Sequence, residues 1–384
     1  MRRRPTLAAV MLLVLVPACG RSRSEAPPSR ERVLVAVLGG FTGPDPALAE
    51  AMSRGGELAV RQYNAAAGST YRATLKREDT AGTADGAQGA AERLAGEDLL
   101  IGVVGPGTLD EAESAGRTLT QAQIPMLLPT ITAGGLAEAG LSGYRRLVAD
   151  DHRQGVVTGG EAAALAAGQK VAIVRDGGGE AADFARGARE AVDAAKVPVS
   201  RVETLRPRSD LAALSTSIVR DGAGVVVHAG PAERAGAVAA SLRAAGFKGR
   251  LLASSQARDP RFAEWAKDGA SGTLAVCPCA AAADPQVAGF ARSYGRVFRR
   301  PPPPYALESY EGTLMLLEAI EEVEPRKEEV LGFFHNARSF LGISKLYAFD
   351  DQGELLDAPV WIDEFRDGRW QFVRRAGPGP TDGR

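Results

Sequence analysis

The sequence predicts an α/β protein made of two similar units, each a parallel sheet covered by helices on both faces. Short runs of branched aliphatic residues alternate with longer alanine-rich helical segments, and the alternation starts again near residue 170. The chain has 384 residues, 45% of them hydrophobic, which exceeds what a single core usually holds. We therefore expect two lobes.

The first unit shows the order of elements that a parallel sheet requires. Its apolar runs are short, whereas the segments between them are long enough to be crossover helices. Strands are predicted at 32–38, 72–78, 99–105 and 124–129, and helices at 48–68, 84–97 and 109–123.

The second unit repeats this order. Asp259 and Asp284 each precede a proline, a pattern that predicts an N-cap followed by proline at the first helical position. Strands are predicted at 170–176, 197–205, 224–230, 250–255 and 272–278, and helices at 180–195 and 232–246.

The last third of the chain does not continue the alternation. Helical segments come first and strand-like segments follow, with a turn at 351–353. The helices are predicted at 287–299, 305–323 and 326–337, and the strands at 345–356, 358–365 and 369–375. The chain therefore does not divide into two consecutive halves.

The first residues predict export. Three arginines at 2–4 precede an apolar run at 7–16 that is shorter than the roughly 20 residues of a membrane-spanning helix. Cys19 follows Ala18 as in the lipobox of bacterial lipoproteins, where the cysteine is acylated; secretion with a chance cysteine is the alternative. We expect a lipoprotein signal peptide, a polar tether and a disordered tail at 1–18, 19–31 and 375–384.

Composition limits the classes of ligand and partner. Lys and Arg total 46 against 47 Asp and Glu, and this balance disfavours nucleic-acid binding. Cys277 and Cys279 have no histidine at metal-ligand spacing, so no metal site is predicted. Export permits a disulfide between them, but we expect two thiols on alternate sides of a strand end.

The sequence contains no recognisable catalytic motif. There is no GxSxG, HExxH or P-loop pattern, and no cofactor fingerprint with the required glycine order. We therefore expect a binding protein without a cofactor rather than an enzyme.

Six segments, in this order, resemble the leucine/isoleucine/valine-binding proteins of ABC importers: LGGFTGP, IGVVGPGT, IPMLLPTIT, RRLVADDHRQG, KVAIVRD and ALESYEG. The resemblance implies a type I periplasmic-binding-protein fold, in which two lobes joined by a three-segment hinge close over a solute. It spans roughly 32–373 and implies lobe one at 32–150 plus 280–342 and lobe two at 151–279 plus 343–374.

In the first lobe the resemblance implies a cradle for the carboxylate of the ligand. Thr108 stands at the family's first hydroxyl position, but Leu109 replaces the serine that follows. Thr132 keeps the terminal threonine, Thr130 stands where a backbone group contributes, and Leu48 replaces an aromatic lid residue. We expect a weaker, more apolar carboxylate site.

The second lobe departs further from the family. Glu180 and Ala181 align with a Tyr-Gly pair, Pro231 or Ala232 with an aromatic residue, and Ser255 with the acid that pairs with an α-ammonium group. A buried ammonium without a counter-charge costs several kcal/mol. A simple aliphatic amino acid is thus expected only if Glu180 supplies the charge; alternatively, Glu180 is an exposed first-turn residue favoured by the helix dipole.

These inferences predict a lipid-anchored protein on the extracytoplasmic side of a bacterial membrane. It would capture a small carboxylate-bearing solute, an amino acid or related acid, and deliver it to an ABC permease. The alternative is a sensor or accessory lipoprotein with a degenerate cleft.

Overall fold

The computed structural model describes residues 30–336 and 339–377. The predicted signal peptide, Cys19, most of the tether and residues 378–384 lie outside this range. No helix in the described ranges has the length and apolar character needed to cross a bilayer.

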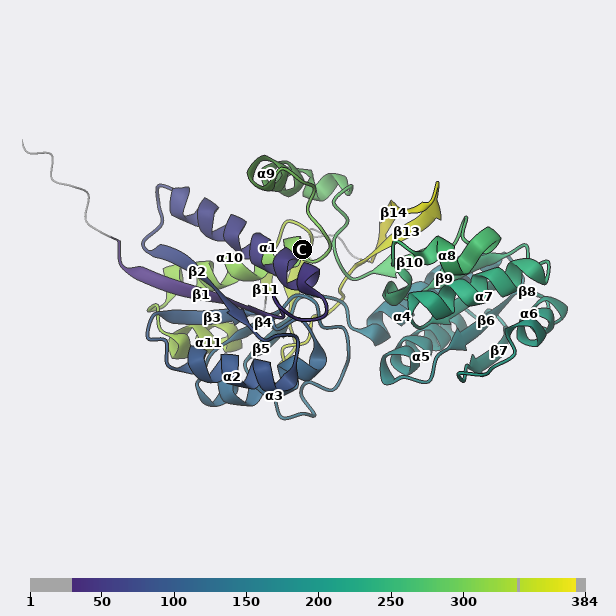
Figure 1. The fold of residues 1–384 in the computed structure, drawn as a ribbon, viewed down its shortest axis with the longest axis horizontal. Helices are drawn as coiled ribbons and strands as arrows, with labels where there is room; N and C mark the ends of the chain where they lie inside the picture. Colours follow the sequence, from purple (N-terminus) through teal and green to yellow (C-terminus); the bar gives the residue numbers. More distant parts are fainter. Residues whose placement is uncertain (1–29, 337–338, 378–384) are drawn as a thin grey trace, which may run out of the picture. The chain divides into compact units, whose positions relative to one another are not determined.

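Within the described residues, the first sheet has five parallel strands in the order β2-β1-β3-β4-β5 (Figure 1). Its strands are β1 (Arg32–Gly39), β2 (Arg72–Asp79), β3 (Leu100–Val104), β4 (Met126–Leu128) and β5 (Tyr144–Arg146). The four predicted strands are confirmed. We did not predict β5, because two of its three residues are arginines rather than aliphatic residues.

Side chains of β1 alternate between two helical layers, as the period of a strand requires. Val35 and Val37 pack against one set of helices, and Ala36 and Leu38 against the other. The first set is α1 (Pro46–Ala65), α10 (Ala306–Glu322) and α11 (Lys327–Asn336); the second is α2 (Ala84–Ala95) and α3 (Leu109–Gln121). Helices therefore cover both faces of the sheet.

The second sheet, in the part of the chain described, has seven strands in the order β14-β13-β10-β9-β8-β6-β7. Strands β6 to β10 are mutually parallel, and β13 and β14 extend the sheet as an antiparallel hairpin. The strands are β6 (Lys170–Arg175), β7 (Val199–Thr204), β8 (Ala223–Ala229), β9 (Arg250–Ala253), β10 (Leu274–Cys277), β13 (Val360–Arg366) and β14 (Arg369–Ala376). Each overlaps a predicted strand.

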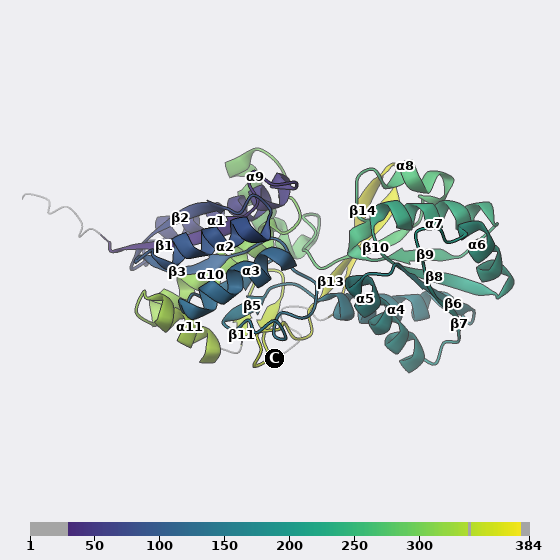
Figure 2. The ribbon, with the colours of Figure 1, turned by 60° about the horizontal axis from the view of Figure 1, so that its bottom comes forward.

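Two helical layers also cover this sheet (Figure 2). One layer is α4 (Asp151–Ala166) and α5 (Gly179–Ala194); the other is α6 (Leu211–Arg220), α7 (Ala232–Ala244) and α8 (Phe262–Ala266). The α/β class with two sheets, predicted from the sequence, is confirmed.

Among the described residues, the chain passes between the two sheets three times: after β5, between β10 and α9 (Ala288–Phe298), and between β12 (Leu346–Ala348) and β13. The strands β11 (Ser339–Leu341) and β12 pair with each other. Tyr347 and Phe349 pack in the core cluster of the first sheet. Judged by packing, the first lobe therefore continues past residue 342. The sequence instead placed the start of the second lobe's last segment at residue 343.

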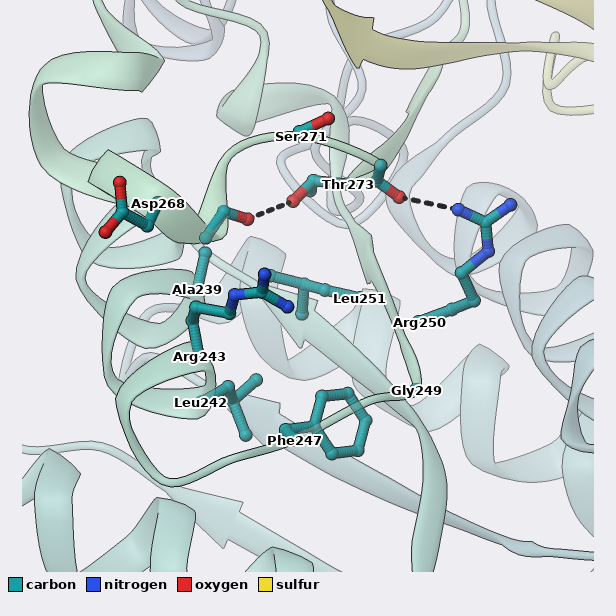
Figure 3. Close-up of a pocket in the computed structure, with 12 residues that line it drawn as sticks. Ala239, Leu242, Arg243, Phe247, Gly249, Arg250, Leu251, Asp268, Ser271 and Thr273 are labelled. Carbon is teal, nitrogen blue, oxygen red and sulfur yellow. Dashed lines mark hydrogen bonds between the residues drawn. The ribbon is translucent and has the colours of Figure 1, made fainter.

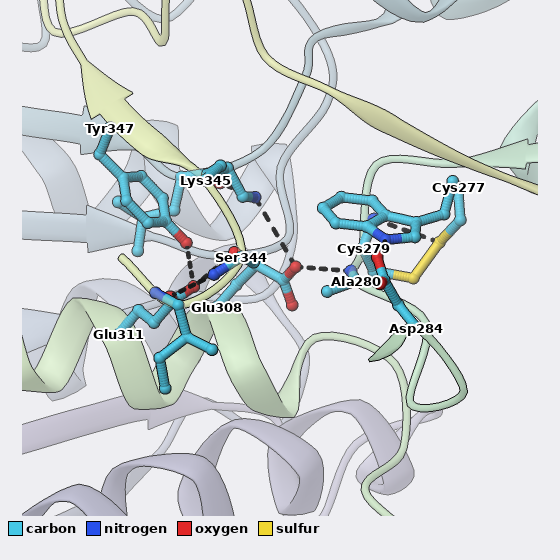
Figure 4. A network of polar contacts seen from close by, with 12 residues as sticks. Cys277, Cys279, Ala280, Asp284, Glu308, Glu311, Ser344, Lys345 and Tyr347 are labelled. Carbon is cyan, nitrogen blue, oxygen red and sulfur yellow. Dashed lines mark hydrogen bonds and ion pairs between the residues drawn. A yellow bond between two sulfur atoms is a disulfide. The ribbon is translucent and has the colours of Figure 1, made fainter. Parts of the chain in front are cut away.

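A buried ion pair joins elements next to all three connections (Figure 4). Lys345 Nζ lies 3.7 Å from Glu308 Oε1 and donates a hydrogen bond of 2.9 Å to the carbonyl of Leu147, just after β5. Glu308 in turn accepts the N–H of Ala280, beyond β10, at 2.7 Å. Burial lowers the pKa of Lys345 and raises that of Glu308.

The expectation of two free thiols at Cys277 and Cys279 is wrong in the structure, where the two residues form a disulfide. The strand ends at Cys277 and the chain bends at Pro278, so the Cα atoms of the two cysteines lie 5.1 Å apart, within the usual range for a disulfide. The described residues contain no cluster of His, Cys, Asp and Glu suited to a metal.

One of the two predicted proline-linked caps is confirmed. Asp284 caps a short 3₁₀ turn at Pro285–Val287, accepting the N–H of Gln286 at 3.0 Å. The N-cap predicted at Asp259 is wrong, because α8 begins later, after Arg261. Asp259 instead accepts the N–H of Arg261 at 2.7 Å.

Candidate functional site

A cavity of about 470 Å³ is lined by segments that follow the carboxyl ends of strands in both sheets. The first sheet contributes Leu109, Ala133 and Gly134, from the segments after β3 and β4. Segments after β6, β8 and β9 contribute the rest: Asp176, Gly178, Gly179, Glu180, Ala181, Asp183, Gly230, Pro231 and Gln256. In open parallel sheets, ligands bind at these strand ends.

Another cavity, of about 230 Å³, lies within the second lobe (Figure 3). Arg250 and Thr273, at the beginnings of β9 and β10, are among its lining residues. It is therefore at the amino-terminal edge of the sheet, and no residue of the first lobe lines it. We place the candidate site in the cavity at the carboxyl ends.

The predicted carboxylate cradle at the start of α3 holds a carboxylate of the chain itself. The hydroxyl of Thr108 donates to Glu111 Oε2 at 2.8 Å, and the N–H of Thr108 donates to the same oxygen at 3.0 Å. The hydroxyl of Thr80 donates to the other oxygen. Glu111 is 2% exposed, so these donors are committed to a buried internal acid.

The other predicted residues of the first lobe lie around this helix start. Leu109 is the first residue of α3 and lines the cavity. Leu48 packs beside Gly107, and the buried Thr130 donates to the Gly107 carbonyl at 2.8 Å. The carbonyl of Thr132 accepts the N–H of Asp151. Leu48, Thr108, Thr130 and Thr132 are outside the cavity lining.

In the second lobe, Glu180, Ala181 and Pro231 line the cavity. Ala232 does not line it, being buried as the first residue of α7. Ser255 begins a 3₁₀ turn, η1 (Ser255–Ala257), whose next residue, Gln256, lines the cavity and donates from its amide to Glu180. Sequence reasoning missed Gln256, because it compared only the adjacent position with the family.

Asp176 is a second lining acid that the sequence did not single out, although it directly follows β6. Its Oδ1 lies 3.4 Å from Arg234 Nε, whereas its Oδ2 is buried without a hydrogen-bond partner in the described structure. Burial raises the pKa of Asp176, and the charge of Arg234 opposes this rise. Nearby His228 is fully buried, which lowers its pKa to about 3 and keeps the ring neutral.

Glycines bring the starts of α4 and α5 together. A Cβ on Gly155 would lie 2.0 Å from the Phe184 carbonyl oxygen, and one on Gly159 would lie 2.3 Å from that of Ala188. In both contacts the glycine and its partner are separated by the same number of positions along the chain, so the two helices run parallel. The same interval places Asp151, the first residue of α4, beside Glu180 in the first turn of α5.

Asp151 is a buried acid, 6% exposed, and its Oδ2 lacks a hydrogen-bond partner among the described residues. Its pKa is raised to about 7, mainly by burial and also by the charges of Glu180 and Asp150, while Thr132 and Arg146 act in the opposite direction. Near neutral pH this carboxyl group is therefore partly protonated.

We expect Asp151→Asn to stabilise the chain at pH 8 by about 2 kcal/mol. The folded pKa lies above the unfolded value of about 3.9, so the wild type loses stability as pH rises from about 4 to 7, whereas asparagine does not titrate. Urea unfolding of both proteins should show a difference that vanishes near pH 4. A difference that is constant with pH would contradict the assignment.

The chain has two α/β lobes, and segments at the strand ends of both lobes line a common cavity. This arrangement defines a two-lobed binding protein. Residues 32–368 match the family model described as periplasmic binding protein, and the chain belongs to this family. Membership confirms the resemblance predicted from the sequence, makes the chain a solute-binding protein rather than an enzyme, and implies an extracytoplasmic location.

One relative is an amino acid binding protein of Pseudomonas aeruginosa, 30% identical over 222 residues that cover 57% of this chain. The match spans 59% of the length of that protein.

Solved structures share the fold at lower identity. The substrate-binding protein LivJ of a branched-chain amino acid transporter from Streptococcus pneumoniae, in complex with isoleucine, has a TM-score of 0.72 and 18% identity, covering 91% of this chain and 100% of that one. A solute-binding protein of an ABC transporter from R. palustris, in complex with benzoate, has a TM-score of 0.68 and 17% identity, covering 91% and 97%. The fold is the type I periplasmic-binding-protein fold.

Proposed function

We propose that this chain is the solute receptor of an ABC importer. It is exported as a lipoprotein, held on the extracytoplasmic side of a bacterial membrane through Cys19, and binds a small solute of the amino-acid class between its lobes. The observation that carries the proposal is the cavity lined by strand-end segments of both sheets.

Closure around the solute follows from this arrangement. A solute that contacts Leu109 of the first lobe and Glu180 of the second stabilises the state in which both residues reach it. The three connections between the sheets serve as the hinge. The permease recognises the closed, loaded form, and no covalent bond is made or broken.

The relatives support a small organic solute. The Streptococcus protein was solved with isoleucine, which carries an amine and a carboxylate, and the R. palustris protein with benzoate, which has no amine. The same fold therefore accepts solutes that differ in charge, and the lining residues of this chain decide which one it binds.

A thermal-shift screen of the purified full chain tests the proposal. The panel contains amino acids, amines, and aromatic and aliphatic carboxylates. A ligand at one hundred times its dissociation constant adds about 2.7 kcal/mol of stability and raises the melting temperature by several degrees.

Matched variants locate the binding site. Gly134 is exposed, and a Cβ added to it would lie 3.7 Å from Asp183 Oδ2, another lining residue, so Gly134→Trp should fill the cavity and abolish the shift. Ser271→Trp, in the cavity of the second lobe, should leave the shift unchanged. A cooperatively unfolding protein that responds to no member of the panel would contradict solute capture and favour the sensor or accessory alternative.

A further inference from the structure

We propose that the solute is a small organic cation, an amine or guanidine with net positive charge, and that a carboxylate on the solute is not required. The inference rests on the proposed function, since it names the class of solute that the same cavity takes. Glu180 is the principal group that receives the positive charge.

The charged residues that line the cavity share one sign. Asp176, Glu180 and Asp183 are acidic, and among the described residues lining the cavity there is no lysine, arginine or histidine. An anionic solute would find no basic side chain among the lining residues, because the nearby Arg234 and Arg186 lie outside the lining and pair with Asp176 and Asp183. A cationic solute would be attracted, and most strongly where water is excluded on closure.

Glu180 is the lining acid without a cationic partner in the described structure. Asp176 pairs with Arg234, and Asp183 pairs with Arg186 at 2.8 Å. The partner of Glu180 is the neutral amide of Gln256, which orients the carboxylate but leaves its charge uncompensated. A ligand ammonium or guanidinium group would supply the missing charge through a charge-assisted hydrogen bond.

Asp151 is a second, independent sign of a missing cation. Its buried Oδ2 has no hydrogen-bond partner within the described residues, and the helix packing sets it beside Glu180. The groups around it are Glu180, Asp150, Arg146, Thr132, Tyr305 and Gln154, whose amide donates to the other oxygen, Oδ1, at 3.4 Å. A positive charge bound at Glu180 would also offset the repulsion between these two acids.

The helix starts of α3 and α4 are already satisfied internally, whereas those of α5 and α7, which line the cavity, have no side-chain cap, and the start of α5 bears Glu180. At α3 the donors of Thr108 and Thr80 go to Glu111, and at α4 the N–H of Arg153 donates to Asp150 at 2.6 Å. A solute carboxylate placed at either start would have to compete with a carboxylate of the chain. At the uncapped start of α5 it would meet the carboxylate of Glu180, so the amine is the group that the charged lining favours.

Isothermal titration calorimetry on the purified full chain provides the test. The probes are agmatine and arginine as cations, leucine as a zwitterion, and benzoate as an anion. We expect the cations to bind at least ten times more tightly than leucine or benzoate, and to bind more weakly as salt is added. Agmatine, which lacks the carboxylate of arginine, should bind at least as well as arginine.

Glu180→Gln should weaken binding of the cations at least tenfold. The matched control is Glu328→Gln, which changes an exposed first-turn glutamate of α11 outside the cavity and should leave affinity unchanged. Equal or tighter binding of leucine or benzoate, or unchanged cation affinity in Glu180→Gln, would overturn the cation assignment while leaving solute capture intact. Absence of binding by every probe, with a cooperatively folded protein, would overturn both.

Discussion

Replacing Lys345 with methionine is expected to lower the free energy of unfolding by about 3–5 kcal/mol. The Lys345 side chain is 1% exposed and lies 3.7 Å from Glu308, which is itself fully buried. Methionine fills much of the same volume but leaves the Glu308 carboxylate without its buried counter-charge, and it leaves the Leu147 carbonyl without its donor. The loss of stability therefore comes mainly from the buried Glu308 carboxylate, which has lost its counter-charge.

Urea unfolding monitored by circular dichroism measures this cost. The control is the double variant Lys345→Met with Glu308→Leu, which removes both charges and should recover at least about 1 kcal/mol of the loss. A single variant within 1 kcal/mol of the wild type, or a double variant less stable than the single, would show that the pair is not a coupled buried ion pair.

Trp361→Ala is expected to lower the free energy of unfolding by about 3–5 kcal/mol. The indole is fully buried, and its N–H donates to Asp284 Oδ2 at 2.8 Å. Lys345 Nζ lies 5.4 Å from the centroid of the ring and the Arg375 guanidinium 5.5 Å from it. Alanine would leave a large cavity between the second and third connections and remove a ring that faces two cations.

Trp361→Phe separates the contribution of the packed ring from that of the indole hydrogen bond to Asp284. Phenylalanine keeps most of the apolar volume but leaves Asp284 without the indole donor, so we expect a smaller loss of about 1–3 kcal/mol. The same urea titration serves both variants. Equal stability of the Ala and Phe variants would contradict the packing role of the ring. Because Lys345 contacts this ring, losses from the Lys345 and Trp361 variants should not add.

Local sequence patterns predicted most of the fold. Runs such as 32–38 and 224–230 became buried strands because their branched aliphatic residues face helices on both sides. The strand β5 escaped prediction because its arginines are buried by tertiary partners: Arg146 pairs with Glu354, far along the chain. No local pattern reveals such a partner.

The site was predictable to the extent that it follows strand ends. Leu109 and Glu180 were named from the resemblance to the family, and Pro231 as an alternative to Ala232; Leu109, Glu180 and Pro231 line the cavity, and Ala232 does not. The hydrogen bonds between Thr108 and Glu111 were not predicted, although the capping-box spacing is visible in the sequence. The further hydrogen bond to Glu111 comes from Thr80, which lies on another segment. The disulfide at 277–279 likewise depends on a chain bend at Pro278.

The measurement that tests solute capture between the lobes most directly is amide hydrogen exchange of the full chain, with and without a ligand found by the screen. We predict that ligand slows exchange simultaneously at 105–111 and 132–134 in the first lobe and at 176–183 and 230–231 in the second. Protection confined to one lobe, in particular to the second-lobe cavity around Arg250 and Thr273, would contradict binding at the strand ends of both sheets.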